Sequence, residues 1–119
     1  CLMHQNLGLP ESCMALDLTN ACMGFSNGMM LVSNLIETGV IKAGVVVSAE
    51  NIACTVDATM KKLLTDDTIG RDQLLKMLPT FTLGCGSVAY LLVHESIATK
   101  KHRIIGATGR SATQFADLC

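Results

Sequence analysis

Residues 17–39 read DLTNACMGFSNGMMLVSNLIETG, and this stretch has the form of a strand end, a tight turn and a long helix. Apolar side chains recur in it at helical spacing, at Phe25, Met29, Val32 and Ile36. Gly39 is placed to end the helix in a left-handed backbone conformation. The sequence therefore predicts a long buried helix from about residue 22 to residue 38.

Cys22 lies at or just before the first turn of this predicted helix. Unpaired backbone N–H groups and the positive end of the helix macrodipole favour an anion at such a position. They are expected to stabilise the thiolate, which is the form of cysteine that attacks carbonyl carbons. Cys22 is therefore the candidate nucleophile. The alternative interpretation is a small buried hydrophobe at a strand–helix junction.

Two short apolar runs flank the predicted helix. Residues 13–18 (CMALDL) have the pattern of a buried strand, and residues 43–49 (AGVVVSA) that of a strand buried on both faces of a parallel sheet. Together they predict a right-handed βαβ unit in an α/β fold with a mixed sheet. Ligands bind beyond the carboxyl ends of the strands in such sheets, which is where Cys22 falls.

The later part of the chain is less regular. Residues 69–78 have the periodicity of one amphipathic helix, within a stretch that is either a substrate-lining insertion or a surface connection. Residues 80–94 predict a long strand that Gly84 and Gly86 interrupt. Residues 103–107 predict another strand, which would complete a hairpin with the first.

The composition limits the possible functions. A net charge of -1 gives no electrostatic footprint for nucleic acid. Half of the residues are hydrophobic and only 16% are charged, so we expect some apolar surface to meet another domain or subunit. No apolar run approaches the ~18 residues that span a bilayer, and we expect a cytoplasmic protein. The opening CLMHQNLGL has the pattern of a helix already under way, which predicts a segment of a longer polypeptide.

The six cysteines include no C-x-x-C pair, which argues against a zinc site. An even number of cysteines would suit a disulfide framework in a small secreted chain. Cys13 and Cys85 fall inside apolar strand patterns, however, so reduced thiols in a cytosolic protein are the preferred interpretation. The histidines are expected to be solvated or capped rather than to act as bases; they are His4, His94 and His102.

Three blocks of this sequence resemble the thiolase superfamily, specifically its 3-oxoacyl-acyl-carrier-protein synthase III group. They are DLTNACMGFSNG (17–28), GVVVSAEN (44–51) and TLGCGSVAYLLV (82–93). The final stretch, GATGRSATQFADLC, is most similar to the branch that condenses two long acyl chains head to head for olefin biosynthesis. The resemblance implies a thiolase-like fold, of which residues 1–119 would be a partial N-terminal domain without the C-terminal half.

The resemblance also implies an acyltransferase of fatty acid biosynthesis. Its cysteine takes an acyl group from a coenzyme A (CoA) or acyl-carrier-protein thioester, and a second thioester attacks the acyl-enzyme in a Claisen condensation. Cys22 matches this nucleophile, and its own N–H would be one oxyanion-hole donor. Ile52 and Leu83 match positions that line the acyl pocket. No metal and no cofactor beyond the thioester substrates is implied, and a homodimer is expected, with residues 13–18 as a candidate interface edge.

The sequence departs from the family pattern at the groups that assist condensation. The family's histidine and asparagine, and the glycine that donates the second oxyanion N–H, belong to the second half of the fold. In the olefin branch, a partner-subunit carboxylate is implicated from a loop that would precede Cys1. Residues 1–119 are therefore expected to be inactive alone. A degradative thiolase and a non-catalytic dimerisation or scaffold half remain the alternatives.

The lysine pairs Lys61–Lys62 and Lys100–Lys101 are expected to be solvated faces. Docking of an acidic carrier protein is the alternative for them, because opposite charges steer such encounters.

Overall fold

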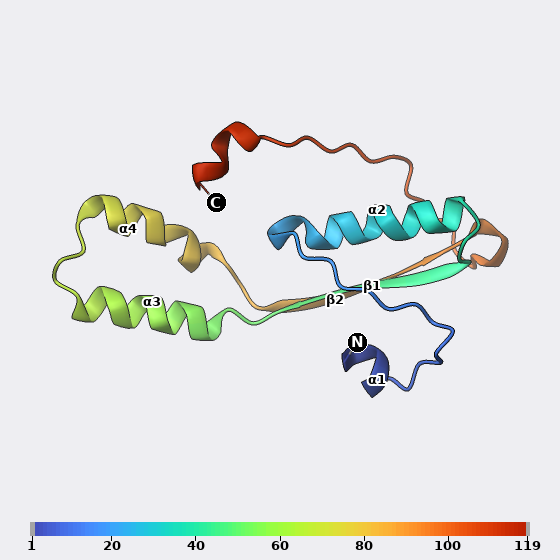
Figure 1. Ribbon diagram of the computed structural model, residues 1–119, viewed down its shortest axis with the longest axis horizontal. Helices are drawn as coiled ribbons and strands as arrows, with labels where there is room; N and C mark the ends of the chain where they lie inside the picture. The colour runs from blue at the N-terminus through green and yellow to red at the C-terminus, as the bar shows by residue number, and fades with distance from the viewer. Residues whose placement is uncertain (1, 119) are drawn as a thin grey trace.

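The computed structural model of the chain describes residues 2–118. In chain order its helices and strands are α1 (Leu2–Asn6), α2 (Gly24–Glu37), β1 (Ala43–Glu50), α3 (Ala53–Thr65), α4 (Arg71–Met77) and β2 (Gly86–Val93), as Figure 1 shows. Four short 3-10 turns lie at Ala21–Met23, Leu78–Thr82, Glu95–Ile97 and Thr113–Leu118. None of the helices in this described part is long and apolar enough to cross a membrane.

The two strands form an antiparallel sheet, in which Ala43 pairs with Val93 and Glu50 pairs with Gly86. α2 lies over one face of this sheet (Figure 1). On that face the side chain of Val46 is only 8% exposed. On the opposite face Val45 is 58% exposed, because successive side chains of a strand point to opposite sides. The sheet therefore has one covered and one open face.

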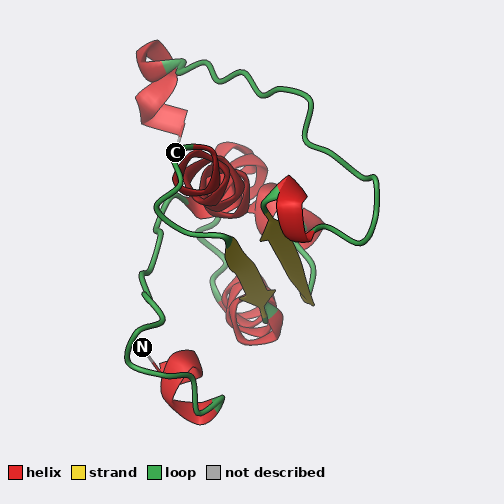
Figure 2. Ribbon diagram, turned by 90° about the vertical axis from the view of Figure 1, so that its right-hand side faces the viewer, coloured by secondary structure: helices red, strands yellow, loops and turns green. Residues whose placement is uncertain are grey.

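The chain is extended for its length. Its radius of gyration is 19.3 Å, whereas a compact domain of this size has one of about 13–14 Å. α1 and the turn at Thr113–Leu118 lie on opposite sides of the sheet, well away from it, in both views (Figures 1 and 2). Within the described residues, the buried hydrophobic side chains are Ile36 and Val46. Much of the apolar surface is consequently uncovered.

The close approach of α2 to β1 depends on two glycines. A Cβ atom added at Gly44 would lie 2.6 Å from Cγ1 of Val32, and one added at Gly28 would lie 2.8 Å from Cγ1 of Val46. Carbon atoms at optimal separation are roughly 3.5–4.0 Å apart, so neither site has room for a side chain. Each element thus presents a glycine to a valine of the other, and these two contacts set α2 antiparallel to β1.

A second contact attaches the start of α2 to the other strand. The rings of Phe25 on α2 and Tyr90 on β2 pack edge to face, with centroids 5.4 Å apart and planes at 78°. This is a preferred arrangement for aromatic pairs, since it places the positive edge of one ring against the negative face of the other. The first turn of α2 is therefore held against both strands of the sheet.

The predicted helix is confirmed, with differences in extent and burial. α2 begins at Gly24, directly after the 3-10 turn, and Gly39 adopts the predicted left-handed conformation with φ of 74°. Only Gly28 and Ile36 of α2 are buried. The prediction of a buried helix is wrong for this chain, because no other described element covers the face of α2 that points away from the sheet.

The predicted sheet is wrong in its connections. Residues 13–18 and 103–107 are irregular backbone, so neither the βαβ unit nor the hairpin forms, and the sheet is antiparallel rather than mixed. A strand needs a neighbour for its N–H and C=O groups, and the described part of the chain offers none to either segment. The predicted strand at 80–94 is confirmed only over Gly86–Val93, because Leu78–Thr82 forms a 3-10 turn with Pro79 near its start.

The remaining helices agree with the sequence only in part. α1 confirms the predicted N-terminal helix, and α4 lies within the amphipathic stretch 69–78. The sequence does not predict α3, because charged residues interrupt its apolar periodicity. Cys13 and Cys85 lie outside strands and are exposed, so their placement inside buried strands is also wrong.

The turn between α3 and α4 is organised by Asp66. Its Oδ1 accepts hydrogen bonds from the hydroxyl of Thr68 at 2.5 Å and from the N–H of Thr68 at 3.1 Å. The hydroxyl, then the N–H, and to a smaller extent the charge of Lys62 hold the pKa of Asp66 below its usual value. Because the folded-state pKa is depressed, the stabilisation is present at neutral pH and is lost as the pH falls through that pKa.

We expect the substitution Gly44→Ala to destabilise the full-length protein by about 1–3 kcal/mol, because the added methyl group overlaps Val32 and a β-branched side chain in a helix has little rotamer freedom. Urea unfolding measures this change. Gly84→Ala is the matched control, since nothing lies within 4 Å of a Cβ atom there. Equal stabilities of the two variants would contradict the close approach of α2 and β1.

We expect Thr68→Val to raise the pKa of Asp66 towards its usual value, because valine removes the hydroxyl and keeps the backbone N–H. As the pH is lowered, the stabilisation that the ionised Asp66 gives to this turn is then lost at a higher pH than in the wild type. An NMR titration of the Asp66 carboxyl group measures the change. Thr65→Val is the control, because the Thr65 hydroxyl donates to the carbonyl of Lys61 instead.

Candidate functional site

Cys22 lies in the tight turn that leads directly into α2. In this turn, the N–H of Met23 donates to the carbonyl of Asn20 at 2.9 Å, and the N–H of Gly24 donates to the carbonyl of Ala21. Within residues 2–118, no backbone partner accepts from the N–H of Cys22. The turn therefore places a thiol and a free N–H donor on the same residue, at the start of a helix of 14 residues.

The Cys22 side chain is exposed in this chain and is a free thiol. Exposure alone does not distinguish it, since Cys13, Cys54 and Cys85 are also exposed and free. Cys54 even lies in the first turn of another helix, α3. What separates Cys22 from these three is the 3-10 turn before α2, with its left-handed residue Ala21.

The structure brings the three predicted site residues to one end of the sheet. Because α2 runs antiparallel to β1, the start of α2 lies over the carboxyl end of β1 (Figure 1). Ile52 follows β1 almost directly and is half-buried, whereas Leu83 precedes β2 and is 50% exposed. The pairing of Glu50 with Gly86 places these flanking residues at the same end. Cys22 thus lies at the carboxyl end of β1, as predicted.

An open hollow of about 420 Å³ lies at this end, formed by residues 49–51 and 85–87. In it the Cys85 thiol donates to Oδ1 of Asn51 at 3.5 Å. The same oxygen accepts from the N–H of Ala53 at 3.2 Å and so helps to begin α3. Sequence reasoning does not single out Asn51, although an asparagine directly after a strand and before a helix is a typical turn signal.

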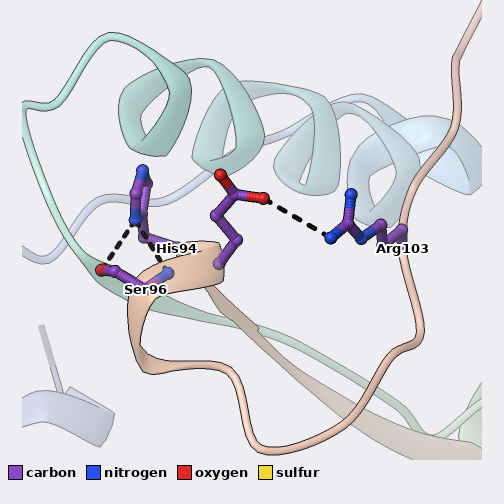
Figure 3. A network of polar contacts seen from close by, with 4 residues as sticks. His94, Ser96 and Arg103 are labelled. Atoms are coloured by element: carbon purple, nitrogen blue, oxygen red, sulfur yellow. Dashed lines mark hydrogen bonds and ion pairs between the residues drawn. The ribbon is translucent and has the colours of Figure 1, made fainter.

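The histidine at the other end of the sheet is structural. Nδ1 of His94 lies 2.9 Å from Oγ of Ser96 and accepts from the N–H of Ser96 at 3.2 Å (Figure 3). The neighbouring Glu95 forms an exposed ion pair with Arg103 at 3.5 Å. The N–H of His94 also donates to the carbonyl of Lys42, which joins the end of β2 to the residue before β1. His94 is thus a capping residue, as expected.

The sequence has relatives of known activity. The model of the 3-oxoacyl-acyl-carrier-protein synthase III family matches residues 16–67, which include Cys22, α2 and β1. The chain is 37% identical over 122 residues to an acyl-CoA:acyl-CoA alkyltransferase of Shewanella oneidensis, covering 100% of this chain and 34% of the relative. It is 32% identical over 118 residues to that of Xanthomonas campestris pv. campestris, covering 99% and 35%.

Solved structures agree with these relatives. The chain superposes on cerulenin-bound OleA of Xanthomonas campestris with a TM-score of 0.90 at 29% identity, over 98% of this chain and 35% of that one. Acetamide-bound OleA gives a TM-score of 0.89 over the same share of the two chains. The thiolase-like fold predicted from the sequence is thereby confirmed, for a chain that spans about a third of the length of these relatives.

Sequence and structure lead to the same assignment, since the block around Cys22, the antiparallel pair of strands and the whole backbone trace all match one group of proteins. Over nearly its whole length the chain is thus similar to the acyl-CoA:acyl-CoA alkyltransferases, and residues 16–67 match the 3-oxoacyl-acyl-carrier-protein synthase III family.

Proposed function

We propose that this chain is the nucleophile-bearing part of an enzyme that condenses two acyl thioesters. The Cys22 thiolate attacks the thioester carbonyl of an acyl-CoA, an S–C bond forms to the enzyme, and the CoA thiol leaves. A second thioester then attacks the bound acyl group as its carbanion. A C–C bond forms, and the Cys22 thiolate is released with the β-keto product.

The observation that carries this proposal is the turn at Cys22. Its thiol and its unpaired N–H belong to one residue, so the N–H lies next to the carbonyl that the sulfur attacks. A donor in that place stabilises the oxyanion of the tetrahedral intermediate. The helix start adds a positive electrostatic potential, which favours both the thiolate and the oxyanion.

The relatives support acyl-CoA as the first substrate. Both acyl-CoA:acyl-CoA alkyltransferases align with nearly the whole chain, and the family model includes Cys22. An acyl-carrier-protein thioester is the second candidate donor. Ile52 and Leu83 are the residues that we assign to the acyl pocket, because both flank the strand ends next to the start of α2.

The proposal places the acid–base groups and the second oxyanion donor outside residues 2–118. It also includes a homodimer, a cytoplasmic location and no cofactor apart from the thioesters. Residues 1–119 alone then hold the nucleophile but do not complete the reaction.

Iodoacetamide at neutral pH is expected to alkylate Cys22 faster than the other described cysteines, because the helix start stabilises the attacking thiolate. Peptide mass spectrometry of the full-length protein after a short exposure measures the labelling at each thiol. Cys54 is the internal control, since it is equally exposed and lies in the first turn of α3. Even labelling of all cysteines, or sparing of Cys22, would contradict an activated nucleophile.

Incubation of the full-length protein with a long-chain acyl-CoA is expected to leave an acyl group on Cys22, visible as a mass increase of the peptide that contains it. Cys22→Ser should abolish the adduct and lower condensation by at least about 10³-fold, because the nucleophile is lost. Cys54→Ser is the matched control and should retain both.

The products distinguish the alternatives. A β-keto thioester, or the β-keto acid that forms when water hydrolyses it, supports head-to-head condensation, whereas free CoA without a condensed product contradicts it. An enzyme that runs preferentially towards cleavage of β-keto thioesters would be a degradative thiolase. Absence of any acyl adduct on Cys22 would leave a scaffold with a structural cysteine.

A further inference from the structure

Ala21, the residue before Cys22, has an unusual backbone conformation. Its φ is 40°, and among the described residues it alone has a positive φ without being glycine. The other positive values belong to Gly8 and Gly39, which follow α1 and α2. The left-handed residues that follow helices in this part of the chain are glycines, whereas the left-handed residue before α2 is an alanine.

The segments on either side of Ala21 lie close to other parts of the fold. A Cβ atom at Gly24 would lie 3.4 Å from the carbonyl oxygen of Leu18, and one at Gly28 would lie 3.5 Å from the Cδ1 atom of Leu18. Leu18 is thus seated against the first turns of α2. Phe25 in turn packs on Tyr90. The change of direction between Leu18 and α2 falls on the five residues in between, 19–23, which include Ala21 and Cys22.

An alanine at this position restricts the turn more than a glycine does. The left-handed region open to L-residues is small, whereas glycine moves freely through a much wider range of φ and ψ. Strained backbone conformations persist only where the surroundings determine them, and they are concentrated at functional sites. The Cβ atom of Ala21 therefore narrows the set of orientations that the next peptide unit, which includes the N–H of Cys22, can adopt.

We propose that Ala21 is a positioning residue for Cys22: its confined left-handed backbone fixes the Cys22 N–H and thiol in the arrangement that acyl transfer requires. The inference rests on the proposed function, because it assigns to Ala21 a role in the chemistry of Cys22. Ala21 contacts neither substrate nor leaving group in this role and acts through the backbone alone. Small displacements of a reacting group cost large factors in rate, which is why such confinement matters.

The test compares Ala21→Gly with the wild type in the full-length protein. Glycine accepts φ of 40° without strain, so the thermal stability should stay equal or rise. The rate of Cys22 acylation by acyl-CoA is nevertheless expected to fall about tenfold, with KM changed by less than about twofold. The rate at which iodoacetamide alkylates Cys22 at neutral pH should also fall, because the thiol is held less firmly at the helix start. A role limited to stability would change neither the acylation rate nor the alkylation rate of Cys22.

Two further variants complete the design. Ala21→Val places a β-branched residue where a positive φ is unfavourable, so both stability and acylation should fall. Ala53→Gly, at the first residue of α3, is the control for added backbone freedom at a helix start and should leave Cys22 unchanged. An Ala21→Gly protein with wild-type acylation and alkylation would overturn the positioning role. If wild-type Cys22 takes no acyl group but is alkylated selectively, the proposed acyl transfer fails, and the alkylation rates of the wild type and Ala21→Gly still decide whether Ala21 positions the thiol.

Discussion

The direct contact between α2 and β1 is the constraint on which the rest of this structure depends. Two glycine–valine contacts, Gly28 with Val46 and Val32 with Gly44, lie one helical turn apart along α2. Two such points fix both the distance and the direction of the helix over the strand. The start of α2 is thereby held at the carboxyl end of β1, and the position of Cys22 follows from the core of the fold rather than from its own side chain.

Tertiary pairing then brings distant residues to that position. β2 pairs with β1 although α3 and α4 lie between them in the sequence, so residues 85–87 reach residues 49–51 and form the hollow at this end of the sheet. At the opposite end of the sheet His94 contacts Ser96, and its N–H donates to the carbonyl of Lys42, which joins the end of β2 to the residue before β1. The candidate site thus lies at one end of the small sheet, and the contacts at the other end join the two strands.

Local features of this fold can be predicted from the sequence, and non-local ones cannot. The helix, its end at Gly39 and the location of Cys22 follow from spacing within one segment. Residues 13–18 look like a strand because they are apolar, but strand formation requires a partner, which no local pattern encodes. The left-handed conformation of Ala21 is equally hidden, because alanine is the strongest helix former and gives no sign of a turn.

The open face and edges of the sheet have a consequence for handling this segment by itself. Leu91 is 67% exposed and faces the same way as its cross-strand partner Val45, on a sheet whose two outer edges have no neighbouring strand among the described residues. Uncovered edges with apolar side chains template the addition of further strands from other molecules. Produced as an isolated polypeptide, this stretch is therefore prone to self-association and precipitation, and its handling in solution requires a covering partner or a solubilising fusion.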